Sequence, residues 1–170
     1  MLSNMVSIPQ SSIRDNFDNR ARGLVTAYCP NMNEDDHDTC AERLIRLYQL
    51  SSTPPSDDPT HFDACIIFDS QVGSNLDLQL DIMRLFGGTL FCVRKLLERG
   101  QYDISFTTNR GYAYFFEKKT MFTRIILYKT KSVLRDWLNS TSYQTQNWKD
   151  ASQVTLPAYV GPVPLQYWNN

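Results

Sequence analysis

Three segments of alternating apolar residues follow one another in the second half of the chain, and only a few residues separate them. The segments are Tyr102–Thr108, Gly111–Glu117 and Met121–Lys129. Alternation with a period of two predicts β-strands, and links this short let neighbouring strands pair only in antiparallel fashion. The sequence therefore predicts an antiparallel sheet whose hairpins turn at residues 109–110 and 118–119.

A helical pattern precedes these strands. Apolar residues recur every three or four positions from Leu78 onward, and Ser74 with Asp77 has the spacing of a capping box. We expect one long helix that ends at Gly100. The adjacent glycines at 87–88 are expected to bend or split it, because glycine destabilises a helix interior by about 1 kcal/mol relative to alanine.

The remaining signals complete an α+β fold. Asp63–Phe68 is an apolar run between polar residues, typical of a buried strand, and Ser132–Leu138 fits a short helix after the sheet. We therefore expect an antiparallel sheet with a long helix packed on one face, preceded by an N-terminal arm with a short strand and helix. The predicted parts are an acidic arm and linker (residues 1–60), an α+β core (61–140) and an extended C-terminal tail (141–170).

Two short elements are expected in the N-terminal arm. Arg22–Cys29 has apolar residues suited to a strand, which Pro30 ends. Thr39 and Glu42 have capping-box spacing, so a helix should begin at Thr39. Ser51–Pro59 is rich in serine, proline and aspartate, as a linker would be.

Four acidic residues stand directly before this expected helix, where the positive end of the helix dipole favours them. They are Glu34, Asp35, Asp36 and Asp38. The cluster is typical of a charged helix start. It also supplies candidate self-association residues, because an acidic arm can dock on a basic surface of another copy.

Charge reverses along the chain. Residues 1–69 carry 11 acidic and 5 basic side chains, whereas residues 70–170 carry 7 acidic and 12 basic side chains. A basic surface attracts the phosphates of anionic lipids or of RNA, although solubilising surfaces also mix both signs. The candidate membrane- or phosphate-binding residues are Arg94, Lys95 and Arg99, expected at the end of the long helix, and Lys118 and Lys119 at a hairpin tip.

One segment matches the first five positions of the octapeptide of RNA recognition motifs. It runs from Arg110 to Glu117 and alternates aromatic residues with others. Exposed aromatic side chains on one sheet face can stack bases, and Arg110 can hold a phosphate. Arg110, Tyr112 and Tyr114 are therefore an alternative RNA-binding set.

Two features favour burial of these aromatic residues instead. A strand follows the segment where an RNA recognition motif has a helix. A two-residue turn at 118–119 would also pair Phe116 with Met121 and place the aromatic residues on the face of Ile125. We predict that the three alternating aromatic residues are core residues: Tyr112, Tyr114 and Phe116.

Signals of catalysis or metal binding are weak. Neither a Gly-x-Ser-x-Gly elbow nor a phosphate-binding glycine loop occurs, so we expect no enzyme and no small-molecule substrate. Cys29, His37, Cys40 and His61 have zinc-binding side chains but lack Cys-x-x-Cys or His-x-x-x-His spacing. We expect no metal and no cofactor, and zinc at these four residues stays an open alternative.

No targeting segment is apparent in the sequence. No apolar run approaches the roughly 18 residues of a membrane-spanning helix. Met1–Gln10 lacks the basic and apolar regions of a secretory signal. We therefore expect neither a transmembrane segment nor secretion.

In the order of elements over residues 50–140, and in a mass of 19.7 kDa, the chain resembles the matrix proteins of rhabdoviruses, in particular those of the plant-infecting group. The acidic arm differs from the polybasic arm that such proteins usually carry. The resemblance implies a virion structural protein that self-associates and bridges nucleoprotein with its RNA to an anionic membrane, in virions and in host cytoplasm or nucleus. The alternative is an RNA-binding or host-modulating viral accessory protein that uses an aromatic and basic sheet surface.

Overall fold

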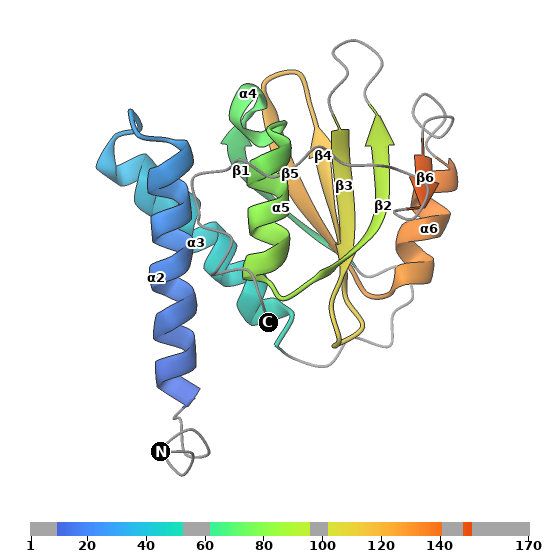
Figure 1. Ribbon diagram of the computed structural model, residues 1–170, viewed down its shortest axis with the longest axis horizontal. Coiled ribbons are helices and arrows are strands. Elements are labelled where there is room, and N and C mark those ends of the chain that lie inside the picture. Colours follow the sequence, from blue (N-terminus) through green and yellow to red (C-terminus); the bar gives the residue numbers. More distant parts are fainter. Residues whose placement is uncertain (1–9, 53–61, 96–101, 141–147, 151–170) are drawn as a thin grey trace.

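The computed structural model describes residues 10–52, 62–95, 102–140 and 148–150, with side chains described over most of these ranges. Figure 1 shows a sheet with helices on both sides. On one side lie α2 (Gln10–Tyr28), α3 (Glu34–Leu50), the short α4 (Ser70–Gly73) and α5 (Leu76–Leu85). On the other side lies α6 (Lys131–Ser140).

The sheet has six strands in the order β1-β5-β4-β3-β2-β6, and each neighbouring pair is antiparallel. The strands are β1 (Phe62–Asp69), β2 (Thr89–Lys95), β3 (Tyr102–Thr107), β4 (Ala113–Lys118), β5 (Phe122–Tyr128) and β6 (Trp148–Asp150). The predicted α+β class with an antiparallel sheet is confirmed. The expected strands at β1, β3, β4 and β5 and the expected helix at α6 are also confirmed.

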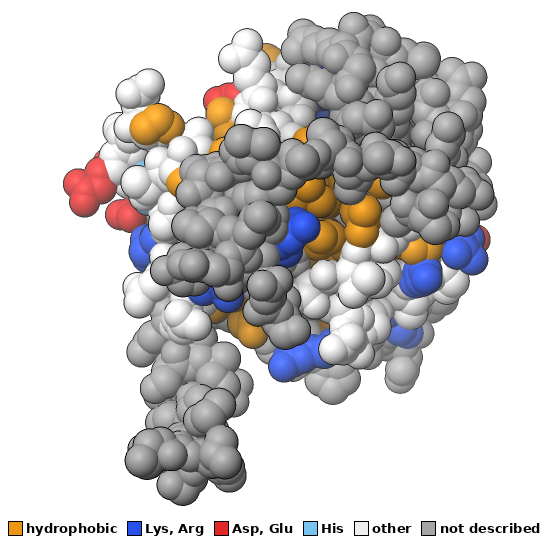
Figure 2. Space-filling model, in the orientation of Figure 1, with side chains coloured by type: hydrophobic (Ala, Val, Ile, Leu, Met, Phe, Trp, Pro, Cys, Tyr) orange, Lys and Arg blue, Asp and Glu red, His pale blue; other side chains and the backbone are white. Residues whose placement is uncertain are grey.

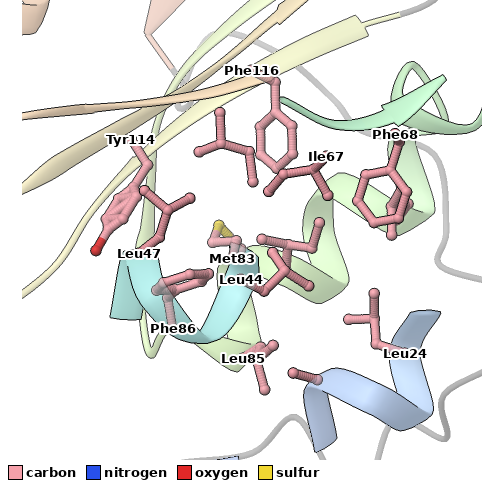
Figure 3. Close-up of a cluster of buried hydrophobic side chains, with 14 of the residues drawn as sticks. Leu24, Leu44, Leu47, Ile67, Phe68, Met83, Leu85, Phe86, Tyr114 and Phe116 are labelled. Atoms are coloured by element: carbon pink, nitrogen blue, oxygen red, sulfur yellow. The ribbon is translucent and has the colours of Figure 1, made fainter. Parts of the chain in front are cut away.

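The two faces of the sheet bury separate sets of side chains, because successive residues of a strand point to opposite faces. Tyr114 and Phe116 of β4 point toward α3 and α5, and Figure 3 shows them beside Leu44, Leu47 and Phe86. The intervening side chains pack under α6, where the core consists mainly of Phe115, Ile126, Leu134 and Leu138. The helices therefore cover both faces of the β4–β5 hairpin.

The predicted burial of the aromatic residues is confirmed. Tyr112 is 3% exposed, and Tyr114 and Phe116 are 0% exposed. The predicted register is wrong, since Phe116 pairs with Ile125 and the hairpin loop is longer than the two residues expected. The error is four residues, an even number, so the aromatic residues still share a face with Ile125.

The predicted long helix is wrong. Helix α5 ends at Leu85, and Gly87 adopts a left-handed backbone conformation with φ +70°. Gly88 then lies so close to the ring of Phe106 that a Cβ atom there would clash with it. The two glycines thus end the helix, and the chain continues as β2.

Helix α5 also begins one residue later than predicted, because its N-cap is Asn75 and not Ser74. The Asn75 side chain accepts hydrogen bonds from the backbone N–H groups of Asp77 and Leu78. Asn is as effective as Ser in this position. The capping-box spacing of Ser74 and Asp77 therefore pointed to the right place in the chain but to the wrong capping residue.

The expected strand at Arg22–Cys29 is also wrong, because these residues belong to the long helix α2 and its end. Buried Phe17, Ala21, Leu24 and Val25 repeat at helical spacing. An eight-residue window that starts at Arg22 misses the first half of this stripe. The apolar residues alone do not distinguish a strand from a helix over so short a run.

Helix α3 starts five residues before the expected Thr39. Asn33 is its N-cap and accepts a hydrogen bond from Asp36 N at 2.9 Å. Thr39 Oγ1 instead donates to Asp35 O at 2.9 Å, inside the helix. The acidic cluster is thus part of the first turns of α3 and does not precede it.

The N-terminal helices belong to the main core. One hydrophobic cluster joins Leu24 of α2 and Leu44 of α3 to Phe68, Phe116 and the rest of that sheet face (Figure 3). Tyr28 Oη of α2 also donates a hydrogen bond to Asp81 of α5. The expected division of the chain near residue 60 therefore does not divide this core. Apart from β6, the predicted C-terminal tail lies outside the described residues, and so does most of the predicted linker.

Candidate anion-binding site

The sheet topology brings two basic parts of the chain to one end of the sheet. Strands β2 to β5 form an antiparallel meander, so β2 and β4 both end at the same end of the sheet, at the top of Figure 1. Arg94 and Lys95 are the last residues of β2, and Lys118 is the last residue of β4. We call this end of the sheet the Lys118 end.

The structure places some of the five predicted phosphate-binding residues at the Lys118 end and leaves the others undescribed. The backbones of Arg94 and Lys95 reach it as strand residues, so the expected placement at the end of a helix is wrong. Their side chains, and all of Arg99, lie outside what the structure describes. Lys118 and Lys119 are on the β4–β5 hairpin as predicted.

A buried carboxylate organises the basic side chains of the hairpin. Glu117 Oε1 accepts a hydrogen bond from Arg124 Nε at 2.8 Å and lies 2.7 Å from Arg124 Nη2 and 3.1 Å from Lys119 Nζ. The Glu117 side chain is only 7% exposed, so solvent screens these contacts weakly. Lys118 forms no ion pair with any residue of the described ranges. The hairpin thus carries three cations and one carboxylate, so it keeps a positive excess.

The tip of the hairpin is fixed in place. Lys119 N donates to Phe122 O at 2.8 Å across the loop, and Ser70 N of α4 donates to Met121 O at 3.2 Å. Ser70 Oγ also donates to Lys119 O at 3.3 Å. Helix α4 therefore holds the loop from the outside, which lowers the entropy that Lys119 would lose on binding a partner.

Met121, at this tip, was missed by the sequence analysis, which paired it with Phe116 in the core. It is 80% exposed and is the one large hydrophobic side chain that is exposed where the structure describes side chains. The run of polar and charged residues from Glu117 to Thr120 was the available signal for a longer loop. That signal does not fix the register, because a two-residue turn is equally compatible with it.

The acidic cluster lies at the start of α3 and faces solvent. Glu34, Asp35, Asp36 and Asp38 are all exposed. Asp36 Oδ2 accepts a hydrogen bond from Asn33 Nδ2 at 2.9 Å, and Asp38 Oδ1 pairs with Arg22 Nη1 at 3.0 Å. In Figure 2 the acidic side chains gather on the left, over the α2–α3 connection. The interpretation of the cluster as a charged helix start is confirmed, and its role in self-association stays a prediction.

The alternative RNA-binding set does not form a stacking surface. The Tyr114 ring is stacked on Phe106 with centroids 4.8 Å apart, beneath Phe86 of α5. Burial raises the pKa of Tyr114, and the nearby Ser51 hydroxyl lowers it by a smaller amount. Bases cannot reach rings that the helices cover, so Tyr112 and Tyr114 do not form the stacking platform of the alternative RNA-binding set. Arg110 is exposed in the β3–β4 turn.

The four candidate zinc ligands are spread over different environments. Cys40 Sγ donates to Ile67 O at 2.7 Å, and His37 Nε2 lies 2.6 Å from Thr26 Oγ1. Cys29 is buried, and burial together with the nearby Asp69 carboxylate raises its thiol pKa, which favours the protonated form over the metal-binding thiolate. His61 lies outside the described residues. Within the described ranges, no three His, Cys, Asp or Glu side chains gather as a metal site would require.

Similarity to known proteins does not indicate the function of this chain. No protein-family model, no curated protein and no solved structure matches the chain. Within the part of the chain that the structure describes, no helix is both long and apolar enough to cross a membrane. The positive excess on the fixed β4–β5 hairpin and the exposed acidic start of α3 are therefore the features from which a function can be inferred.

Proposed function

We propose that this chain is a non-enzymatic structural protein of the viral matrix type, which self-associates and joins a nucleoprotein to an anionic membrane. The observation that carries the proposal is the fixed β4–β5 hairpin, which presents Lys118 and Lys119 at one end of the sheet. Strand β2 ends with Arg94 and Lys95 at the same end. The resemblance to rhabdovirus matrix proteins that the sequence indicated motivates the viral part of the proposal, although α5 and β2 replace the long helix in that resemblance. The expected places of action are the virion and the host cytoplasm.

The membrane contact is electrostatic in this proposal. A basic residue near an anionic lipid surface contributes about 1 kcal/mol. The few cations at the Lys118 end thus give weak binding for one subunit, and assembly of many subunits makes it strong through multivalency. Membrane binding and self-association are therefore expected to depend on each other.

Self-association joins the acidic start of α3 in one copy to the basic core of the next, through cations other than those that meet the membrane. Such a contact uses two different surfaces, so it generates an open array when the rotation between copies does not close a ring. The acidic surface stands on a fixed element, because α3 packs on the core beside β1. The docking acids are Glu34, Asp35, Asp36 and Asp38.

An RNA-binding or host-modulating accessory protein remains the second candidate. Arg110 supports it, because this side chain is exposed in the β3–β4 turn. The aromatic half of the candidate RNA site gives no support, since Tyr112 and Tyr114 are buried. A protein of this kind would bind RNA as a monomer and would not require lipid.

The proposal is tested by light scattering against ionic strength and by flotation with vesicles that contain phosphatidylserine. The variant Lys118→Glu/Lys119→Glu should weaken vesicle binding, and with it the assembly of subunits on the vesicle surface. Salt should weaken both in the wild type, since screening shortens electrostatic reach to about 3 Å at 1 M. Arg20→Glu/Arg46→Glu, which makes the same charge change at exposed positions of α2 and α3, is the matched control. The proposal is wrong if the two variants lose vesicle binding equally, or if the wild type stays monomeric and does not bind vesicles.

A further inference from the structure

A second pair of cations converges on α6. Lys131 Nζ lies 4.5 Å, and Arg135 Cζ lies 5.4 Å, from the centroid of the Phe91 ring. Phe91 belongs to β2 and is only 7% exposed, whereas both cations are exposed. Strand β2 therefore positions both charged groups over the face of one ring, while both side chains stay exposed to solvent.

These two charges do not stabilise the helix that carries them. Like charges four residues apart destabilise a helix by about 0.2 to 0.5 kcal/mol, and Lys131 also meets the positive end of the helix dipole. The first turn of α6 contains no acidic residue, and neither cation forms an ion pair with another described residue. Among the described residues of α6 itself nothing offsets this cost, and the offset comes from β2 through the two contacts with the Phe91 ring, at about 0.5 to 1 kcal/mol each.

The pair lies at the end of the sheet opposite Lys118. Helix α6 begins just after β5 ends at Tyr128, and the β3–β4 turn that carries Arg110 is at this same end. Lys129, in the β5–α6 connection, is there too. In Figure 2, basic side chains appear on the right, in the region where Figure 1 places α6, and others lie along the lower part of the molecule. A strand of six or seven residues separates the two ends by about 20 Å.

We propose that Lys131 and Arg135 form a second phosphate-binding site, which holds the backbone of single-stranded RNA, with Arg110 and Lys129 at the same end. The choice of RNA over lipid rests on the proposed function. A bilayer that meets the Lys118 end lies about 20 Å away, which is more than twice the screening length of about 8 Å at physiological salt. One subunit can then hold lipid at one end of its sheet and RNA at the other.

The test measures RNA binding and vesicle binding separately on the full chain. RNA affinity is taken from fluorescence anisotropy of a labelled single-stranded oligonucleotide, and lipid binding from flotation with phosphatidylserine vesicles. Lys131→Glu/Arg135→Glu should lower RNA affinity at least tenfold and leave vesicle binding within twofold. The slope of log affinity against log salt should become shallower by about 1.4, since each lost phosphate contact to a single strand removes about 0.7. The milder Lys131→Gln/Arg135→Gln should change both quantities in the same direction, which covers the case in which charge reversal impairs folding.

Three outcomes separate this inference from the proposed function. Unchanged RNA affinity in both α6 variants would overturn the second site and leave the membrane proposal intact. Equal loss of RNA and vesicle binding would also overturn it, because the two ends would then share one ligand. Loss of RNA binding in the α6 variants, together with no vesicle binding by the wild type, would support the second site and contradict the membrane proposal.

Discussion

Helices α3 and α6 begin with opposite charges, and the two starts differ in what those charges do for the fold. Three acidic residues occupy the first turn of α3, where the helix dipole and the Asn33 cap favour negative charge. Lys131 begins α6, where the dipole disfavours it, and Arg135 follows one turn later. The helix itself thus accounts for the acids of α3, whereas the cations of α6 gain nothing from their own helix and, within the described ranges, are stabilised only by the Phe91 ring of β2.

This comparison gives a way to separate structural from functional charge. A charged residue that stabilises its own helix needs no partner to explain it. A charged pair that costs its helix free energy, and has no described ion-pair partner, indicates a ligand outside the chain. By this criterion Lys131 and Arg135 indicate a binding site more strongly than Glu34, Asp35 and Asp36 do.

The largest expected effect tests whether α3 belongs to the fold at all. Deletion of residues 1–50 should abolish cooperative unfolding, because it removes Leu44, Leu47 and the other α2 and α3 side chains that cover Tyr114 and Phe116. The measurement is thermal unfolding followed by near-UV circular dichroism. If the truncated protein stays monomeric and unfolds cooperatively, α2 and α3 are not needed for the fold and form a separate arm, as the sequence predicted.

The next effect concerns a single side chain beneath α3. Tyr114→Ala should lower the free energy of unfolding by about 3 to 5 kcal/mol, as large-to-small aromatic changes in a core do. Tyr114→Phe is the control and should change stability by less than about 1 kcal/mol, because the buried hydroxyl has no hydrogen-bond partner with good geometry. Chemical denaturation measures both. Equal and small losses in the two variants would mean that the ring is not packed as described.

Alkaline pH should weaken the same core. Burial raises the pKa of Tyr114 and of Tyr128, so the folded state keeps these protons where the unfolded state loses them. Stability is therefore full below the ordinary tyrosine pKa of about 10 and falls as the pH rises above it. Urea midpoints between pH 8 and 11 measure the fall, and Tyr114→Phe should reduce it. An unchanged midpoint across that range would contradict the burial of both hydroxyl groups.

The sequence predicted the elements that depend on local pattern. Strands β3, β4 and β5 were predicted because alternation and short links are visible within a few residues. Strand β2 was not, because Leu90 and Val93 also fit a helical spacing. Phe91 and Cys92 both face α6 at a β-bulge, which interrupts the alternation.

The candidate sites divide in the same way. Lys118 and Lys119 were predicted on a hairpin tip from a local turn. The pair of Lys131 and Arg135 over Phe91 could not be predicted, because it depends on α6 crossing the sheet beside β2, some forty residues away in sequence. The burial of Tyr114 was predicted from the strand pattern alone, but the helices α3 and α5 that cover it lie far from it in sequence, and the contact with α3 was not predicted.

A smaller effect tests the acidic side of the comparison. Glu34→Gln/Asp35→Asn should destabilise the protein by about 0.5 to 2 kcal/mol, because each acid in the first turn contributes about 0.3 to 1 kcal/mol with the helix dipole. The control is Glu42→Gln, an exposed acid farther along α3. Chemical denaturation at low salt should show a lower free energy of unfolding for Glu34→Gln/Asp35→Asn than for Glu42→Gln. At high salt the two free energies should become similar, because salt screens the helix dipole. If the control loses as much stability, the acids do not act through the helix start.

The smallest expected effect concerns Lys131 at the start of α6, and it decides whether the cations of α6 differ from the acids of α3 in their effect on stability. Lys131→Gln should leave stability unchanged or raise it by a few tenths of a kcal/mol, since it removes a charge that the dipole disfavours and a repulsion with Arg135. Only the contact with the Phe91 ring opposes this gain. Chemical denaturation at low salt is the measurement, with Lys129→Gln, which precedes the helix, as the control. A loss of 1 kcal/mol or more would mean that Lys131 is retained for the fold, and the argument that its charge indicates a phosphate ligand would then fail.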